Sequence, residues 1–338
     1  MRISENIQFK PPFMLRNGHI QSIMASTGPR RALADKMLAN LHSEQLTIKT
    51  KAGVVLTADF TTSNRIVDRN RKNFLVVLLH GWEGSSKSAY IVTTTYTLLV
   101  NGFDVLRLNF RDHGDTHQLN KDIFNSTRID EVGDAIKTFK FQNNYENVLL
   151  GGFSLGGNFA LRISADRGEE LSIKATLAVC PPIDPNNAMK KMNKSFFIYH
   201  YYFITKWRKS LQKKLAFFPN PSIEKLLKNN KTLSEMNAAF IPALTEYKSP
   251  EEYFKSYELI GDRLCNIKSP THLIMSLDDP IIPTEDIHLI NENPFINREV
   301  HHFGGHCGFI ENISGESWLQ TRFVELFERY ISRTIQQT

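Results

Sequence analysis

The stretch "NVLLGGFSLGGNFALRISA" (147–165) places Ser154 between an apolar run and a segment of helical character. Gly152 and Gly156 lie two positions before and after this serine, which gives the pattern G-x-S-x-G. The pattern predicts a strand, a sharp turn and a helix, because larger residues two positions from the turn would collide with the crossing strand and helix. Such a turn exposes a hydroxyl at a helix N-terminus, where backbone N–H groups favour negative charge. We therefore interpret Ser154 as a nucleophile; a glycine-rich turn that packs or binds phosphate is the alternative.

Around this stretch, the chain alternates between apolar runs and helical segments. Eight short runs are predicted as strands: Leu46–Thr50, Val54–Phe60, Phe74–Leu79, Phe103–Phe110, Asn147–Phe153, Ile173–Val179, His272–Leu277 and Arg298–Phe303. From the third run onward, helical character is found at 87–100, 127–142, 157–167, 284–292 and 315–334. This alternation predicts an α/β fold with a mostly parallel sheet and helices on both faces. The first two runs have no helix between them and are expected to form an antiparallel edge.

The composition is that of an ordinary globular protein, with 338 residues, 41% hydrophobic and 22% charged. The length fits one large domain with an insertion, or two domains. The three cysteines, Cys180, Cys265 and Cys307, are too few for a disulfide framework and predict free thiols in a reducing compartment. The first residues lack the apolar core of a signal peptide, and no window reaches the ~20 apolar residues of a membrane span. These features predict a cytoplasmic location.

The basic charge is concentrated in residues 186–232. This segment has ten lysines and one arginine against the single acid Glu224, a local net charge of +10, whereas the rest of the chain carries −4. It also contains nine aromatic residues. We interpret it as part of an insertion after the sixth strand. The predicted organisation is an N-terminal segment at 1–45, a core at 46–183 and 261–338, and a cap at 184–260.

The insertion suggests a lid over the site. In "WRKSLQKKLAFF" (207–218), an apolar stripe recurs at helical spacing with two lysines off the stripe: Trp207, Leu211, Leu215 and Phe218, with Lys209 and Lys213. Such a helix could shelter an acyl chain and face anionic lipid, a pattern of interfacial helices. A solvated cap is the alternative. Nucleic acid is not an expected partner, because the remaining chain is net acidic and shows no recognition fold.

A serine nucleophile needs a base, and the base needs an orienting carboxylate. In chains with this serine turn the order is serine, acid, histidine. "HLIMSLDDPIIP" (272–283) reads as a strand that ends in two aspartates, and functional groups gather at strand carboxyl ends. The spacing from Asp279 to Pro283 fits D-x-x-x-P, so Asp279 is the preferred acid and Asp278 the alternative.

Four histidines follow these aspartates in the chain. His288 lies in a predicted helix, whereas His301 and His302 lie on a strand, where adjacent side chains point to opposite faces. His306, in "FGGHCGF", occupies a glycine-flanked loop just after that strand, which suits a base that must reach a serine. A zinc site in "HHFGGHC" is not expected, because a second pair of ligands is missing.

The donors for an oxyanion are predicted from "FLVVLLHGWEGSS" (74–86), a buried strand that leads into a His-Gly turn. The backbone N–H of Trp82, together with that of Leu155, fits the usual arrangement of an oxyanion hole. We interpret His80 as fixing this loop. Asp112 and His113, in "NFRDHGDT" (109–116), are expected to hold the loop after the next strand.

From about residue 46 to 334 the chain resembles the α/β-hydrolases. In finer detail it resembles their YheT-like branch, which carries an "HG-x-EGS" loop, the serine turn, an "xDDP" turn and a "GGHxGF" loop. "PPFMLRNGHIQSI" (11–23) is similar to the Asn-x-His-x-Gln-Thr segment of that branch, with Ser22 in place of Thr; Trp82 stands where Leu is frequent. The resemblance implies hydrolysis of carboxylic or phospholipid esters.

These residues predict a serine esterase that acts on a small acyl ester; medium-chain and lipid esters are the candidate substrates. Ser154 would attack the acyl carbonyl, His306 would act as general base, and Asp279 would orient the imidazole. Trp82 and Leu155 would hold the oxyanion, and water would release the acid. Neither metal nor organic cofactor is expected. Acyl transfer or thioester hydrolysis on the same residues is an alternative, as is a lipid-binding protein without catalysis.

Overall fold

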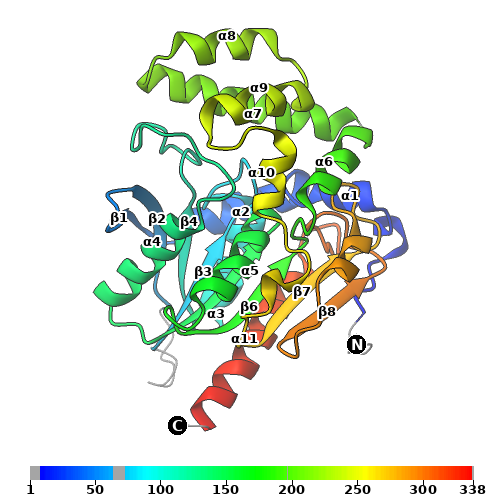
Figure 1. Ribbon diagram of the computed structural model, residues 1–338. Coiled ribbons are helices and arrows are strands. Elements are labelled where there is room, and N and C mark those ends of the chain that lie inside the picture. Colours follow the sequence, from blue (N-terminus) through cyan, green and yellow to red (C-terminus); the bar gives the residue numbers. More distant parts are fainter. Residues whose placement is uncertain (1–7, 64–72, 196, 337–338) are drawn as a thin grey trace.

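Eight strands form one twisted sheet (Figure 1). The computed structural model describes residues 8–63, 73–195 and 197–336. The strands are β1 (Glu44–Lys49), β2 (Val55–Thr61), β3 (Phe74–Leu79), β4 (Asp104–Asn109), β5 (Asn147–Phe153), β6 (Ile173–Val179), β7 (Thr271–Ser276) and β8 (Ile296–His301). Their order is β1-β2-β4-β3-β5-β6-β7-β8; β2 runs antiparallel to both β1 and β4, and the other pairs are parallel. The predicted parallel sheet with an antiparallel edge is confirmed.

The burial of the strands follows from their sequences. All six residues of β3, "FLVVLL", are buried, as expected of a central parallel strand covered on both faces. β1 alternates polar and apolar residues and leaves most of its side chains exposed, as an edge strand can. The apolar runs thus place β3 and β5 in the centre of the sheet, where the loops at their carboxyl ends meet.

Helices cover both faces of the sheet. One core contains side chains of α4 (Ile129–Gln142) and α5 (Leu155–Arg167), and the other contains those of α3 (Ala89–Val100) and α11 (Trp318–Gln336). The helical segment predicted at 284–292 is present but is a short 3-10 helix, η4 (Thr284–Leu289), and not an α-helix. Pro283 and Pro294 bound the segment between them, which leaves room for only a short helix.

In the described residues, five α-helices lie between β6 and β7, above the carboxyl ends of the strands in Figure 1. They are α6 (Pro185–Lys194), α7 (Phe197–Phe217), α8 (Pro221–Asn229), α9 (Leu233–Leu244) and α10 (Pro250–Ser256). Three of them begin with a capping side chain followed by proline: Asp184, Asn220 and Ser249 accept backbone N–H bonds. α9 begins with a capping box between Thr232 and Glu235. These local signals divide the insertion into separate helices, which we call the inserted helices.

The inserted helices share a core with the sheet. Side chains from α6, α7, α8 and α9 pack with residues of β6 and β7 in one apolar cluster, in which Leu233, Met236 and Leu273 are fully buried. The short η3 (Asp262–Leu264) leads from α10 towards β7. No helix in the described part of the chain is long and apolar enough to cross a membrane.

The N-terminal segment begins beside β8, where the N–H of Phe9 donates to His301 Nδ1, and crosses over α3 before it enters β1. It comprises η1 (Phe13–Leu15), α1 (Gly18–Met24) and α2 (Gly28–Ala39). α2 packs on α3 through Ala34, Ala89 and Val92. In Figure 1, α1 lies between the inserted helix α6 and the core, close to the end of β7.

Candidate active site

Ser154 lies at the turn between β5 and α5 in a strained backbone conformation, with φ 54° and ψ −122°. A Cβ on Gly152 would lie 2.2 Å from the carbonyl oxygen of Gly156, and one on Gly156 would lie 2.3 Å from that of Leu79. Both approaches are to backbone and exclude any larger residue. The strain of a non-glycine residue at positive φ is tolerated where the surroundings fix it, which is frequent at functional sites. The sequence thus forces the serine onto a sharp turn.

His306 lies against Ser154 although 152 residues separate them in the chain. Its Nε2 is 2.9 Å from Ser154 Oγ, and its Nδ1 is 2.8 Å from Asp279 Oδ2. Because an ionised carboxylate only accepts hydrogen bonds, Nδ1 carries a proton. In the neutral imidazole, Nε2 is then left to accept the hydroxyl proton of Ser154. The structure brings the three predicted residues into one chain of hydrogen bonds.

The two neighbouring aspartates have different partners. Asp279 is 2% exposed, and its Oδ1 accepts backbone N–H bonds from Ile281 (2.8 Å) and Ile282 (2.9 Å), so that Oδ2 is directed to His306. Asp278 Oδ1 instead accepts the N–H of Gly305 at 2.8 Å. Burial raises the pKa of Asp278 above its ordinary value. Asp278 therefore holds the loop that carries the histidine and does not contact the imidazole.

The imidazole of His306 is held in a buried, acidic environment. Burial lowers the pKa of His306, but the charge of Asp279 and the hydrogen bond to it raise the pKa, with a net value of about 9. The cationic imidazole is thus strongly stabilised by the carboxylate.

The two predicted oxyanion donors are next to Ser154. Leu155 is the first residue of α5, where the backbone N–H has no partner within the helix. The turn that contains Trp82 follows β3 and lies against the serine turn. A Cβ on Gly81 would lie 3.2 Å from Ser154 Cβ. The N–H of Gly81 donates to the hydroxyl of Tyr90 at 3.0 Å, which anchors the turn. Trp82, Leu155 and Ser154 line the same cavity.

The other histidines near the site have structural contacts. His80 Nδ1 bonds to the carbonyl of Gly81 and its Nε2 accepts from the N–H of Phe110; burial lowers its pKa to about 4, which keeps the ring neutral. His113 Nδ1 bonds to the carbonyl of Arg111. His301 accepts the N–H of Phe9, while the side chains of His288 and His302 point to solvent.

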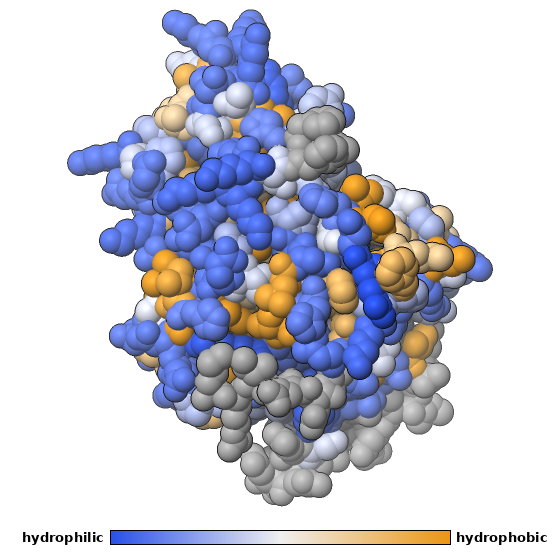
Figure 2. Space-filling model, turned by 90° about the vertical axis from the view of Figure 1, so that its right-hand side faces the viewer, coloured by the Kyte–Doolittle hydropathy of each residue, from blue (hydrophilic) through white to orange (hydrophobic). Residues whose placement is uncertain are grey.

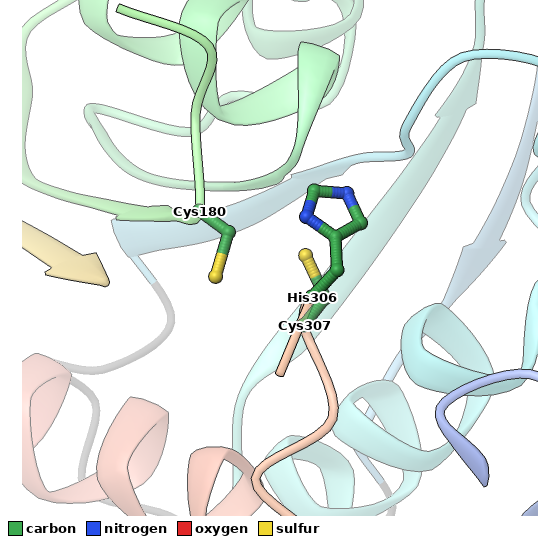
Figure 3. Close-up of side chains that lie close together, drawn as sticks. All are labelled: Cys180, His306 and Cys307. Atoms are coloured by element: carbon green, nitrogen blue, oxygen red, sulfur yellow. The ribbon is translucent and has the colours of Figure 1, made fainter. Parts of the chain in front are cut away.

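Two thiols lie close to the imidazole of His306 (Figure 3). One potential ligand atom from each of Cys180, His306 and Cys307 falls within 4.8 Å of the others. Both ring nitrogens of His306 are already used by Ser154 and Asp279, so a metal ion held by this ring would displace one of those hydrogen bonds. Cys265 is exposed, and all three thiols are free. The expectation that the reaction needs no metal stays a prediction.

A cavity of ≈ 150 Å³ opens beside Ser154, beneath the inserted helices. Its walls are mostly aromatic and aliphatic and include Trp82, Phe203, Trp207 and Phe240. Trp82 stacks on Phe203 with ring centroids 5.4 Å apart and meets Trp207 edge-on at 5.6 Å. Phe203 and Trp207 of α7 thus contact the turn of the core that carries Trp82.

One wall residue of this cavity is a buried lysine that sequence reasoning missed. Lys214 Nζ donates to Asp112 Oδ1 at 2.8 Å and to the carbonyl oxygens of His117, Asn120 and Asp122. Its side chain is 5% exposed. These hydrogen bonds connect α7 to the loop after β4. Asp112 thus holds that loop through its bond to Lys214. The available signal in the sequence was that Lys214 lies three residues after Leu211, which places it on the apolar side of the helix.

Sequence reasoning also missed the contacts of α1 with the site. The N–H of His306 donates to Ser22 Oγ at 2.8 Å, and the N–H of Ile310 donates to Gln21 Oε1 at 2.6 Å. Both residues belong to the segment 11–23, whose motif was recognised without a role.

Known proteins share both the sequence pattern and the fold. A family model described as the alpha/beta hydrolase fold matches residues 75–313. YheT of Escherichia coli is 23% identical over 263 residues, 76% of this chain and 77% of that protein. The monoacylglycerol lipase of Saccharomyces cerevisiae is 22% identical over 278 residues, 76% of this chain but only 60% of the lipase. The phospholipase ABHD3 of Bos taurus is 22% identical, with 79% of this chain and 66% of that protein covered.

Solved structures show the same architecture at low identity. The esterase Pf2001 of Pyrococcus furiosus has a TM-score of 0.55 at 18% identity and covers 88% of this chain and 95% of its own. Est1E of Butyrivibrio proteoclasticus has a TM-score of 0.57 at 17% identity, with 85% and 99% covered. Together with the family match, these confirm the predicted fold, and the similarity to YheT confirms the resemblance that the motifs predicted.

Proposed function

Because this chain belongs to the alpha/beta hydrolase fold family, we propose that it hydrolyses carboxylic esters through an acyl-enzyme on Ser154. One observation carries the proposal: His306 Nε2 lies 2.9 Å from Ser154 Oγ while Nδ1 lies 2.8 Å from buried Asp279. These distances are within hydrogen-bond reach for a nucleophile, its base and the group that orients the base. The relatives named as lipase and phospholipase support ester hydrolysis as the reaction class.

The reaction follows from the geometry. Ser154 Oγ attacks the acyl carbonyl while His306 Nε2 takes its proton, and the imidazolium then gives that proton to the departing alkoxide. Asp279 stabilises the imidazolium without taking its proton. The N–H groups of Trp82 and Leu155 stabilise the oxyanion, each by about 3 kcal/mol in comparable enzymes. Water then attacks the acyl-enzyme, with His306 again as base, and releases the carboxylic acid.

We propose that the inserted helices form a cap that shelters the acyl group. The cavity next to Ser154 is lined largely by apolar side chains of these helices, such as Met189, Trp207 and Phe240. Such walls favour a medium or longer acyl chain over acetate, since each buried methylene contributes about 0.8 kcal/mol. The basic outer surface is proposed to meet anionic lipid. The predicted cytoplasmic location stays a prediction.

Substitution of the nucleophile tests the proposed function. Wild-type protein should hydrolyse p-nitrophenyl butyrate and be labelled at Ser154 by a fluorophosphonate, and Ser154→Ala should abolish both while circular dichroism is unchanged. A competing alcohol in the assay, with products separated by chromatography, distinguishes hydrolysis from acyl transfer. Labelling at a different serine, with Ser154 unmodified, would overturn the assignment.

A further inference from the structure

The loop that carries His306 needs support from outside itself. Gly304, Gly305, Cys307 and Phe309 all have positive φ values, from 48° to 148°, and two of these residues are not glycine. Such conformations cost about 1–3 kcal/mol each for non-glycine residues and persist only where surrounding contacts impose them. The contacts that impose these conformations must come from segments packed against the loop.

Helix α1 packs directly against this loop. A Cβ on Gly18 would lie 1.8 Å from the carbonyl oxygen of Asp278, and a Cβ on Gly305 would lie 2.4 Å from that of Gly18. Asn17 fixes the start of α1, because its Oδ1 accepts the N–H bonds of His19 and Ile20. The first turn of α1 therefore lies between the turn that carries the acid and the loop that carries the base.

Two side chains of α1 hold the loop at points on either side of its bend. Ser22 Oγ donates to the carbonyl of Gly18 at 2.6 Å, so its lone pairs are left to accept the N–H of His306 at 2.8 Å. Gln21 is fully buried; its Oε1 accepts the N–H of Ile310, and its Nε2 donates to the carbonyl of the same residue at 3.1 Å. The loop is thus fixed at His306 itself and at Ile310.

The other side of α1 contacts the inserted helices. His19 Nδ1 lies 3.0 Å from the hydroxyl of Tyr199, a buried residue of α7, and the two rings stack with centroids 5.7 Å apart. α1 is therefore fixed from both sides and acts as a rigid support between the inserted helices and the histidine loop.

We propose that Ser22 is a positioning residue for the reaction: its hydroxyl holds the backbone of His306 so that the imidazole meets Ser154 and Asp279 together. This inference rests on the proposed function and adds a residue that contacts neither substrate nor reacting atoms. Without the Ser22 hydroxyl, the part-buried N–H of His306 loses its acceptor. The strained loop can then relax and move the imidazole out of line. The loss should appear in kcat, because the alignment of the base matters in the transition state.

Three variants test the role of Ser22. Ser22→Ala should lower kcat for p-nitrophenyl butyrate about tenfold or more, with KM changed less than about twofold. Ser22→Thr keeps the hydroxyl and should retain activity near wild type. Thr27→Ala is the matched control, because Thr27 Oγ1 also donates to a carbonyl four residues back at 2.6 Å, but is exposed and outside the site. Its kcat should be unchanged.

A spectroscopic measurement separates this inference from the proposed function. The Nδ1 proton between His306 and Asp279 should give a downfield proton NMR signal in the wild type, in Ser22→Thr and in Thr27→Ala, and should be lost or broadened in Ser22→Ala. Wild-type kcat or an unchanged signal in Ser22→Ala, or an equal loss in Thr27→Ala, would overturn the inference. Should the wild type neither hydrolyse esters nor label at Ser154, the proposed function fails, while the NMR comparison still decides whether Ser22 aligns His306.

Discussion

At the scale of single residues, the aspartate pair shows how adjacent identical side chains take different roles. Asp279 faces His306 because two backbone N–H groups fix its other oxygen, whereas Asp278 points to the N–H of Gly305. Spacing to Pro283 favoured Asp279 but left Asp278 open, since the chain direction after a strand does not fix which carboxylate turns inward. The contacts in the fold supply that information.

We expect Asp279→Asn to lower kcat/KM by about 10⁴, because an amide in place of the carboxylate favours the wrong imidazole tautomer. Asp278→Asn should lower it less than about tenfold, since the amide oxygen can still accept from the N–H of Gly305. Hydrolysis of p-nitrophenyl butyrate measures both. Similar losses in the two variants would contradict the distinct roles.

The pH dependence should follow His306. Only the neutral imidazole can accept the proton of Ser154, and the pKa of His306 is about 9. Therefore kcat/KM should rise with pH and level off above about pH 9 in the free enzyme. Asp279→Asn replaces the carboxylate by a neutral amide and removes the charge that raises this pKa, so the residual activity should level off at lower pH. Initial rates in a constant-ionic-strength buffer series measure this; an activity that falls as pH rises from 7 to 9 would be inconsistent with it.

Much of the site was predictable because its motifs are local. Ser154, Gly152 and Gly156 lie within five residues, and the pattern G-x-S-x-G is itself the signal for their turn, in which a Cβ on Gly152 would meet Gly156 and one on Gly156 would meet Leu79 of β3. The support of His306 by Ser22 was not predictable, because 284 residues separate the two and neither neighbourhood indicates the other.

At the scale of secondary-structure elements, α7 shows that the apolar stripe of a helix does not predict every buried side chain. Trp207 and Leu211 face the cavity, and Lys209 and Lys213 are exposed, as the spacing predicts. Lys214 lies on the buried side, and its partners are oxygens of a loop almost a hundred residues earlier. A charge run cannot indicate which lysine is buried, since that depends on acceptors supplied by another element.

Removal of the Lys214 amine should weaken the attachment of α7 to the core. We expect Lys214→Ala to lower the free energy of unfolding by about 3 kcal/mol, since it leaves the buried carboxylate of Asp112 and three carbonyls without their donor. Lys213→Ala is the neighbouring control; its ion pair with Asp115 is exposed and should contribute less than about 1 kcal/mol. Urea unfolding followed by circular dichroism provides the comparison, and equal effects would argue against the buried anchor.

At the scale of the whole molecule, charge is divided between the cap and the core. The segment 186–232 carries +10 and the remaining chain −4. Figure 2 shows hydrophilic side chains over the upper part of the face in view, which the inserted helices form. The sequence predicted the insertion and its charge, but the cavity wall it contributes depends on how α6, α7 and α9 pack together on the core.

The protein should bind anionic vesicles through the inserted helices. Each basic residue near an anionic surface contributes about 1 kcal/mol, so reversal of Lys209 and Lys225 to glutamate should weaken binding by more than tenfold. Reversal of Lys51, outside the insertion, should leave it unchanged. Co-sedimentation with phosphatidylserine vesicles should decline as salt rises. Equal binding to neutral vesicles would indicate a solvated cap.

The contact of Ser22 with His306 also sets an order of events in folding. The active site joins residues from near the start of the chain to residues near its end, a separation of 284 positions. Contacts between such distant segments form late, because long loops must close before they contribute. A growing chain should therefore remain inert towards esters until the residues around His306 have been made and docked on α1. During refolding from urea, esterase activity should return after the helical circular dichroism signal, and the delay would report the closure of the chain on itself.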